Sequence, residues 1–303
     1  MKDSAKKEGK RAASGSALTR IIIWSVVFCI LSGLFVVGLM DSYTQSGWAW
    51  FDVFRSTSIR YDDRDYAIGG GTSKDAVTDL SVEWVAGSVN VVAAEGDELT
   101  ITEDYTGDDD SMRLRWKIED GQLSIKFCKP RRFGGMNAVK KNLTIAIPSV
   151  MLDAMGSVEI AGVDSDVSFT GNADELSLEA VDGDLAVTGD VGELELNAVD
   201  GTIVFRGGVR NGEVDCVNAH VTMYLDMATR ISVDQVNGVV DLYLGDEIKG
   251  FSAEMDSVGG RITVDGFDGG TTSVKSAYWG DRSLRVEIDG VDAKLNIKKL
   301  TNG

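Results

Sequence analysis

The sequence predicts an all-β protein: a single β-solenoid domain built from coils of about 18 residues and preceded by one transmembrane α-helix. Three observations predict it. A short motif recurs at a near-constant step, apolar and polar residues alternate within each copy, and one long uncharged stretch lies near the N-terminus. The 303 residues include 35 Gly and only 2 Pro, which suits many short, tightly turned strands.

Residues 1–20 are predicted to be a basic cytoplasmic tail. They contain six Lys and Arg residues against two acidic ones, a local charge of +4, whereas the whole chain carries −18. The remainder therefore carries −18 − 4 = −22. A body this acidic repels nucleic acid and anionic lipid, so we expect neither as a ligand of the body.

Residues 21–40, IIIWSVVFCILSGLFVVGLM, are predicted to form a transmembrane helix. The stretch has no charge and is long enough to span a hydrocarbon core. A cleaved signal peptide is the alternative, but the apolar run is longer than a typical h-region and no small-x-small cleavage site follows it. Because the basic flank precedes the span, we expect a single-pass protein of the cell membrane with its body outside.

Residues 41–75 are read as a polar and aromatic connector, and residues 76–303 as the β-solenoid domain. The first coil-like unit is 80-LSVEWVAGSVNV-91. Longer alternating strands are expected at residues 99–105, 113–118, 123–127 and 143–147. Residues 282–300 alternate again and carry more Lys, as expected of a cap on the open end of a stack.

The regular coils are predicted between residues 155 and 268. The second residues of the motif cores are Asp164, Asp182, Asp200, Asn218, Asn237 and Gly259, with steps of 18, 18, 18, 19 and 22 residues. Steps this regular indicate stacked units in which equivalent residues form columns. A meandering sandwich of separate hairpins is the alternative, but hairpins need not keep one step.

Four columns are expected to point into the core, because they occupy the apolar positions of the alternation. The first contains Ile160, Leu178, Leu196, Val214, Val233 and Met255. The second contains Val167, Leu185, Ile203, Val221, Val240 and Ile262, and the third Phe169, Val187, Phe205, Met223, Leu242 and Val264. The fourth holds the small residues Gly162, Ala180, Ala198 and Cys216. We therefore expect Cys216 to be buried and unpaired, with a disulfide to Cys128 as the alternative.

The repeated Asp and Asn residues are interpreted as corners of the coil. The predicted corner residues are Asp164, Asp182, Gly183, Asp200, Gly201, Asn218, Asn237 and Gly238. These residue types suit corners because Gly and Asn tolerate positive φ. A calcium ladder is the alternative, but the calcium-binding nonapeptide is absent and Asn replaces Asp in later turns. We therefore predict no metal and no cofactor.

Two further features are candidate sites. His220, the only His, is expected to be a solvent-facing corner residue, because no G-x-S-x-G elbow accompanies it. The segment KPRRFGG, with Lys126 before it and Lys140 and Lys141 after it, forms the one concentrated basic patch of the predicted body. Its residues Lys129, Arg131 and Arg132 are predicted to contact an anionic surface such as wall polymer or phospholipid headgroups. A solvated hairpin loop is the alternative reading of this basic segment.

The order of a basic tail, one span, LSVEWVAGSVNVVAAEGDELTITEDY and a train of VDGDL-type units resembles the putative adhesin family of bacterial β-solenoid domains of unknown function. The resemblance covers most of residues 77–298 and concerns a structural motif. It implies a bacterial surface protein, sometimes associated with cell-envelope stress systems, and brings no catalytic motif.

We therefore expect a membrane-anchored, non-catalytic binding or adhesion module whose partner is a cell-wall polymer or another envelope protein. A sensor or accessory component of an envelope-stress response is one alternative. A carbohydrate-active β-helix enzyme is another, with paired acids such as Asp164 and Asp166. Against it, residues 158–205 contain no Lys or Arg to bind a polyanionic sugar.

Overall fold

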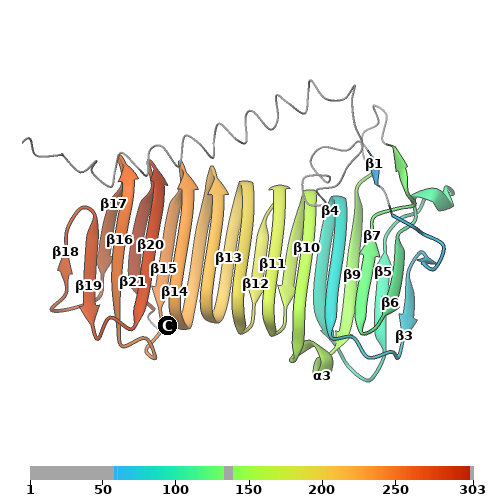
Figure 1. Cartoon of the computed structure of the whole chain (residues 1–303), viewed down its shortest axis with the longest axis horizontal. Coiled ribbons are helices and arrows are strands. Elements are labelled where there is room, and N and C mark those ends of the chain that lie inside the picture. Colours follow the sequence, from blue (N-terminus) through green and yellow to red (C-terminus); the bar gives the residue numbers. More distant parts are fainter. Residues whose placement is uncertain (1–57, 60, 133–138, 301–303) are drawn as a thin grey trace, which may run out of the picture. The chain divides into compact units, whose positions relative to one another are not determined.

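The computed structural model describes residues 58–59, 61–132 and 139–300 (Figure 1). The predicted tail (1–20), the predicted span (21–40) and residues 41–57 of the connector lie outside the described residues. Among the helices that are described, none has the length and apolar character needed to cross a membrane. The described chain is all-β, with one short α-helix and one 3₁₀ turn.

The strands form a two-stranded sheet, in which β1 pairs with β8, and a second sheet of 19 strands. In chain order the elements are β1 (Ser58–Ile59), β2 (Ala67–Ile68), β3 (Gly71–Ser73), β4 (Asp79–Ala94), β5 (Leu99–Glu103), η1 (Asp110–Met112), β6 (Arg115–Glu119), β7 (Gln122–Lys126), β8 (Arg131–Arg132), β9 (Lys141–Pro148) and α3 (Ser149–Leu152). They continue with β10 (Met155–Thr170), β11 (Ala173–Asp182), β12 (Leu185–Thr188), β13 (Val191–Val217), β14 (Ala219–Val236), β15 (Val239–Leu244), β16 (Gly250–Val258), β17 (Arg261–Asp265), β18 (Thr271–Thr272), β19 (Ser276–Gly280), β20 (Leu284–Val291) and β21 (Lys294–Lys299).

The central strands pair in parallel with an offset of one repeat. Val158 of β10 lies beside Leu176 of β11, which lies beside Leu194 of β13. After each corner, the second stretch of the repeat pairs with the same offset through β10, β12 and β13. The step of 19 residues arises at the register shift between Gly207 and Gly208, where β14 contains one extra residue. The columns predicted from the motif therefore correspond to rows of neighbouring strands (Figure 1).

The predicted core columns are confirmed. All the residues of the first two columns are at most 6% exposed, and so are those of the third column except Val264, which is only partly buried. These side chains belong to one hydrophobic cluster that runs through the described part of the sheet. Alternation with exposed polar residues explains the burial, because successive side chains of a strand point to opposite faces.

The C-terminal segment does not cap the stack, and this prediction was wrong. β20 pairs in parallel with β14 on one side and with β16 on the other. In the second stretch, β21 lies between β15 and β17 in the same way. The last repeat in the chain is thus inserted between two earlier ones, and the antiparallel strand β19 covers β16 beyond them. The motifs at Asn237 and Gly259 are therefore not spatial neighbours, because β21 lies between β15 and β17. This explains why the step between them, 22 residues, departs from the regular one.

The N-terminal end is built in the same non-sequential way. β4 pairs with β10 on one side, and with β7 and β9 on the other. The antiparallel strands β6 and β5 continue the sheet beyond β7 and β9. At both ends, antiparallel pairs therefore follow the parallel strands.

Both described cysteines, Cys128 and Cys216, are buried, and the Cys216 thiol is free. Cys216 occupies the predicted column of small residues, with its Sγ 3.7 Å from Oε1 of Gln235. Burial, followed by the charges of Asp215 and Asp234, raises the pKa of the Cys216 thiol to about 12. Such a thiol is a poor nucleophile at neutral pH.

We expect Cys128 and Cys216 to resist alkylation in the native protein and to react only after denaturation. Burial is the reason, because it keeps the reagent away from both sulfur atoms and keeps the Cys216 thiol protonated. Iodoacetamide treatment before and after denaturant, followed by mass measurement of the peptides, tests this. Thiols that become reactive only after a reductant is added would reveal a disulfide and contradict the expectation.

Candidate binding surface

The predicted corner residues lie between the two stretches of each repeat. Asp164, Asp200 and Gly201 are inside the long strands β10 and β13, and two backbone conformations with positive φ occur among the others and Gly201. In the repeats of Asp182 and Asp200, the glycine that follows the Asp has a positive φ, as at Gly201 with φ +135°. A Cβ there would lie 2.2 Å from the carbonyl oxygen of Gly183, so only glycine fits. In the later repeats Asn218 and Asn237 themselves have φ of +55° and +56°. Asn therefore replaces Asp where the corner becomes left-handed.

A second row of carboxylates, which the sequence analysis considered only as paired acids of a possible enzyme, joins neighbouring repeats. The Asp166 carboxylate accepts a hydrogen bond from the Asp184 N–H (3.0 Å), and the Asp184 carboxylate accepts one from the Thr202 N–H (2.7 Å). At the other corner, Asn172 and Asp190 accept hydrogen bonds from the repeat that follows each of them. The 18-residue spacing of these acceptors was visible in the sequence, but their backbone partners were not. Within the described ranges, no group of three or more His, Cys, Asp or Glu side chains is arranged to hold a metal ion.

The outward side of the first stretch of the repeats forms the acidic face. On β10, β11, β13, β14, β20 and β16 its outward positions hold twelve carboxylates and two arginines. Strands in register stand about 4.8 Å apart, so the carboxylates form rows of like charge along the sheet. The carboxylates are those of Glu159, Glu175, Glu179, Glu193, Glu195, Glu213, Asp215, Asp234, Glu254, Asp256, Glu287 and Asp289, and the arginines are Arg230 and Arg285.

One row of this face carries perturbed acids. Asp215, Asp234 and Asp289 are register partners on three successive strands. Partial burial, followed by the charges of Asp234 and Glu213, raises the pKa of Asp215 to about 6. Burial also raises the pKa of Asp234, and the pKa of Asp289 is raised by burial and then by Asp234. The fold therefore holds like charges together at an electrostatic cost.

We expect Asp215→Asn to raise the melting temperature at pH 7 by a few degrees, an effect limited by solvent screening of an exposed side chain. The pKa of Asp215 is higher in the folded state than in the unfolded state, so the protonated carboxyl stabilises the fold. This stabilisation is complete below about pH 4 and is lost as the pH rises through about 6. The gap in melting temperature between variant and wild type should therefore close between pH 7 and pH 4. A gap that stays constant across this range would contradict the assignment.

An open groove of about 510 Å³ lies on the acidic face. Carboxylates from three neighbouring repeats line it, among them Glu175, Glu195 and Glu213. Small side chains such as Ser157 and Ser177 leave the space between them. A cationic or hydrogen-bond-donating group could enter the groove and meet several acceptors at once.

Only some of the lysines around the basic segment, which was predicted to contact an anionic surface, are exposed and without an acidic partner among the described residues. Lys129 is exposed, and the backbone of Arg131 and Arg132 forms β8, which pairs with β1. Lys140, which the sequence analysis grouped with this segment, pairs with Asp164 at 3.0 Å. Lys141, the other neighbour in that group, is not on the surface at all.

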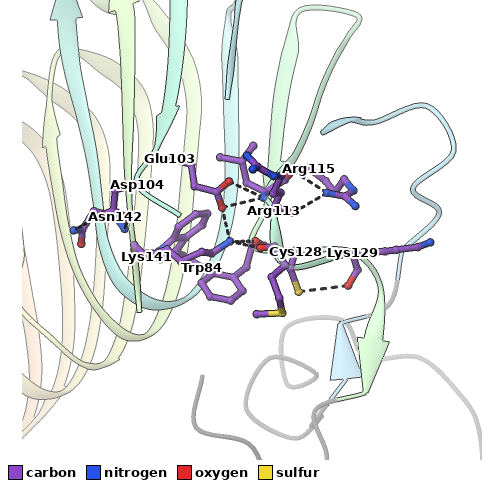
Figure 2. Close-up of polar contacts among 12 residues, drawn as sticks. Trp84, Glu103, Asp104, Arg113, Arg115, Cys128, Lys129, Lys141 and Asn142 are labelled. Carbon is purple, nitrogen blue, oxygen red and sulfur yellow. Dashed lines mark hydrogen bonds and ion pairs between the residues drawn. The ribbon is translucent and has the colours of Figure 1, made fainter. Parts of the chain in front are cut away.

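Figure 2 shows Lys141 pointing inward beside Glu103 and the Trp84 ring. Its side chain is fully buried, and the Nζ atom donates to Glu103 Oε1 at 2.5 Å and to the carbonyl oxygens of Met112 and Phe127. The Nζ atom also lies 5.0 Å from the centre of the Trp84 ring. Burial lowers the pKa of the Lys141 ammonium, and the Glu103 carboxylate opposes that shift. The residue is part of the core, so its assignment to the basic surface was wrong.

His220 is exposed, as predicted. One ring nitrogen, Nε2, lies 2.8 Å from Oδ2 of Asp241 on the neighbouring strand β15. Asp241 also accepts hydrogen bonds from Asn296 and Lys298. Burial alone would raise the pKa of the Asp241 carboxyl, but these donors hold it below its usual value. The sequence analysis missed this cluster, because its members come from three strands that are distant in the chain.

No family model matches this sequence, and no curated protein matches it. Among solved structures, a putative cell adhesion protein from Clostridium sporogenes is 11% identical, with 77% of this chain and 100% of that chain covered and a TM-score of 0.36. A putative adhesin from Bacteroides fragilis is 10% identical, with 77% and 97% covered and a TM-score of 0.38. One from Parabacteroides distasonis is 11% identical, with 78% and 98% covered and a TM-score of 0.34. At such identities and TM-scores, these matches assign neither a family nor a function to this chain.

Proposed function

We propose that this chain is a single-pass protein of the bacterial cell envelope and that its body is a non-catalytic binding or adhesion module. The acidic face is the contact surface. The observation that carries the proposal is the row of like charges held in register there, including an Asp215 whose pKa is raised to about 6. Groups with perturbed pKa values gather at functional sites, because such sites retain arrangements that cost stability.

The partner that best matches this face is another envelope protein with a basic surface. Complementary charges steer the encounter and set the register of the two surfaces. A partner that places Lys or Arg between the rows of carboxylates would remove the repulsion around Asp215 and Asp234. The paired strands beneath the face are already ordered, so little conformational freedom is lost on binding.

Binding without catalysis is supported by the way the paired acids are used. The Asp166 and Asp184 carboxylates, which a carbohydrate-active enzyme would employ, accept backbone hydrogen bonds from the next repeat. Asp164 pairs with Lys140. Asp166 and Asp184 thereby link neighbouring repeats.

We also propose that the repeats are successive coils of one β-solenoid. The parallel pairing at an offset of one repeat and the shared core support this. Deleting one whole repeat, residues 173–190, should leave a cooperatively folding protein, because β10 then meets the next repeat in the same register. Deleting half a repeat, residues 173–181, should prevent folding. Circular dichroism and thermal unfolding distinguish the two, and equal outcomes for both deletions would count against the coil.

The membrane orientation is tested by proteolysis of intact spheroplasts. We expect protease to digest residues 76–303 and to spare residues 1–20, since the basic flank should hold the N-terminus in the cytoplasm. Epitope tags at the two ends, followed on blots, report each region. Digestion of the N-terminal tag in sealed spheroplasts would reverse the orientation.

The acidic face is tested by capture from solubilised envelope fractions with the full-length protein as bait. Replacing Glu175, Glu195 and Glu213 by Gln should abolish capture of a basic envelope protein that the wild type retains, because the groove loses three charges. The matched control replaces Glu95, Glu98 and Asp268 by their amides, which removes the same charge from exposed positions elsewhere. Equal capture by both triple variants would refute the acidic face as the contact surface.

A further inference from the structure

The outward side of the second stretch of the repeats differs in charge from the acidic face. On the same coils, its outward positions hold four carboxylates and four cations. The carboxylates are Asp166, Asp184, Asp241 and Asp265, and the cations are Arg206, Arg261, Lys294 and Lys298. All four cations lie between β13 and β17, at one end of the face. This end, which we call the cationic face, is therefore net positive in a chain of charge −18.

Two of these cations lie directly opposite one another. Arg261 of β17 and Lys294 of β21 are register partners, and both are exposed. Like charges in this position destabilise a sheet. Within the described residues neither one takes part in an ion pair, although the protein has a large excess of acidic side chains. An anion held between them would remove the repulsion.

The neighbouring strands carry a ladder of aromatic and cationic side chains. The Tyr224 and Tyr243 rings stack with centroids 4.7 Å apart and an angle of 12° between their planes. The Arg206 guanidinium lies 3.8 Å from the centre of the Tyr224 ring, and the Lys298 ammonium lies 5.0 Å from that of Tyr243. Both outer faces of the tyrosine pair are thus covered by a cation. What the ladder offers to a ligand is polar: ring edges, hydroxyl groups and N–H donors.

We propose that the cationic face binds a linear, phosphate-bearing polyol polymer of the cell wall. Arg261, Lys294 and Arg206, which form no ion pair with any described residue, supply charge for the phosphates. The tyrosine hydroxyls and Asn296 supply hydrogen-bonding groups for the polyol. Strands about 4.8 Å apart place such groups at regular intervals, so a repeating polymer can contact several of them. The surface is distinct from the acidic face and does not depend on the function proposed for that face.

The covered tyrosine rings favour a polyol chain over a glycan with carboxylate groups. A pyranose ring binds aromatic residues through an open ring face, and here the ring faces of Tyr224 and Tyr243 are occupied. Nor is the basic segment at Lys129 an equivalent site, because its neighbours Lys140 and Lys126 pair with Asp164 and Glu83. On the cationic face Lys298 pairs with Asp241, but Arg261 and Lys294 take part in no ion pair within the part of the chain that the structure describes.

The test measures binding of the purified full-length protein, in neutral detergent, to immobilised poly(glycerol phosphate). Arg261→Ala combined with Lys294→Ala should weaken binding by roughly tenfold or more, since each lost phosphate contact removes a charge-assisted interaction. The matched control, Lys129→Ala with Lys140→Ala, removes the same charge from the basic segment and should bind like the wild type. Tyr224→Phe with Tyr243→Phe keeps the ring stack and should weaken binding several-fold through loss of the hydroxyls.

Folding and specificity are checked in parallel. The Arg261 and Lys294 double variant should melt no lower than the wild type, because a repulsive pair has been removed. The triple variant of the acidic groove should bind the polymer fully. Loss of binding in the Lys129 and Lys140 variant instead, preference for a polyuronate glycan, or binding only to anionic phospholipid vesicles would overturn the proposal. So would failure of the wild type to bind the polymer at physiological salt.

Discussion

Leu196→Asp should unfold the repeat region or destabilise it by more than about 4 kcal/mol, the largest effect we expect from a single substitution. The side chain is fully buried in the first core column, between Leu178 on the preceding strand and Val214, one repeat further along. The substitution removes a packed leucine and places an unpaired charge in apolar surroundings, and both changes oppose folding. Chemical denaturation followed by circular dichroism measures the loss.

Glu195→Ala is the matched control, because residue 195 adjoins Leu196 but points outward. It should change the free energy of unfolding by less than about 0.5 kcal/mol, as exposed substitutions usually do. A slight stabilisation is expected, since a charge leaves the acidic face. Similar losses in the two variants would mean that the inward and outward sides of this strand are wrongly assigned.

Lys141→Met should cost about 3–5 kcal/mol, the range found when one partner of a buried ion pair is removed. The substitution leaves the Glu103 carboxylate buried, and it leaves two main-chain carbonyls, of Met112 and Phe127, without their donor. Methionine fills a similar volume, so the loss reflects charge and hydrogen bonding more than a cavity. Equilibrium unfolding in urea measures the change.

Lys140→Met is the control for this prediction. The neighbouring lysine pairs with Asp164 on the surface, where both side chains are more than half exposed. Exposed pairs of this kind contribute about 0–1 kcal/mol. The double variant Lys141→Met with Glu103→Gln should recover part of the loss, because it also removes the orphaned charge. Equal effects at residues 140 and 141 would contradict the burial of Lys141.

The core columns and the corners were predictable because they repeat locally. Alternation within about ten residues decides which side chains point inward, and a constant step decides which ones lie above one another. Leu178, Leu196 and Val214 therefore needed only their spacing to be assigned to the core. Corner residues such as Gly201 and Asn218 were recognisable for a similar reason, since few residue types tolerate their backbone angles.

The order of the last repeats was not predictable from the same pattern. β20 and β21 have the alternation of any other repeat, so nothing local distinguishes a strand that ends a stack from one inserted between β14 and β16. That choice depends on which strand edges remain unpaired once the preceding repeats are in place. The cationic face follows from it, because the insertion puts Lys294 beside Arg261.

By itself, the sequence determined the strand periodicity, the core columns, the corner chemistry and the net charge of −18. Only the tertiary structure decided how that charge is distributed and which lysines are free. Lys140 and Lys141 are adjacent in the sequence, yet one lies on the surface and the other pairs with Glu103 inside the core. The reason is physical: the environment of a charge depends on long-range strand pairing, whereas local periodicity specifies only the side of the strand on which it lies.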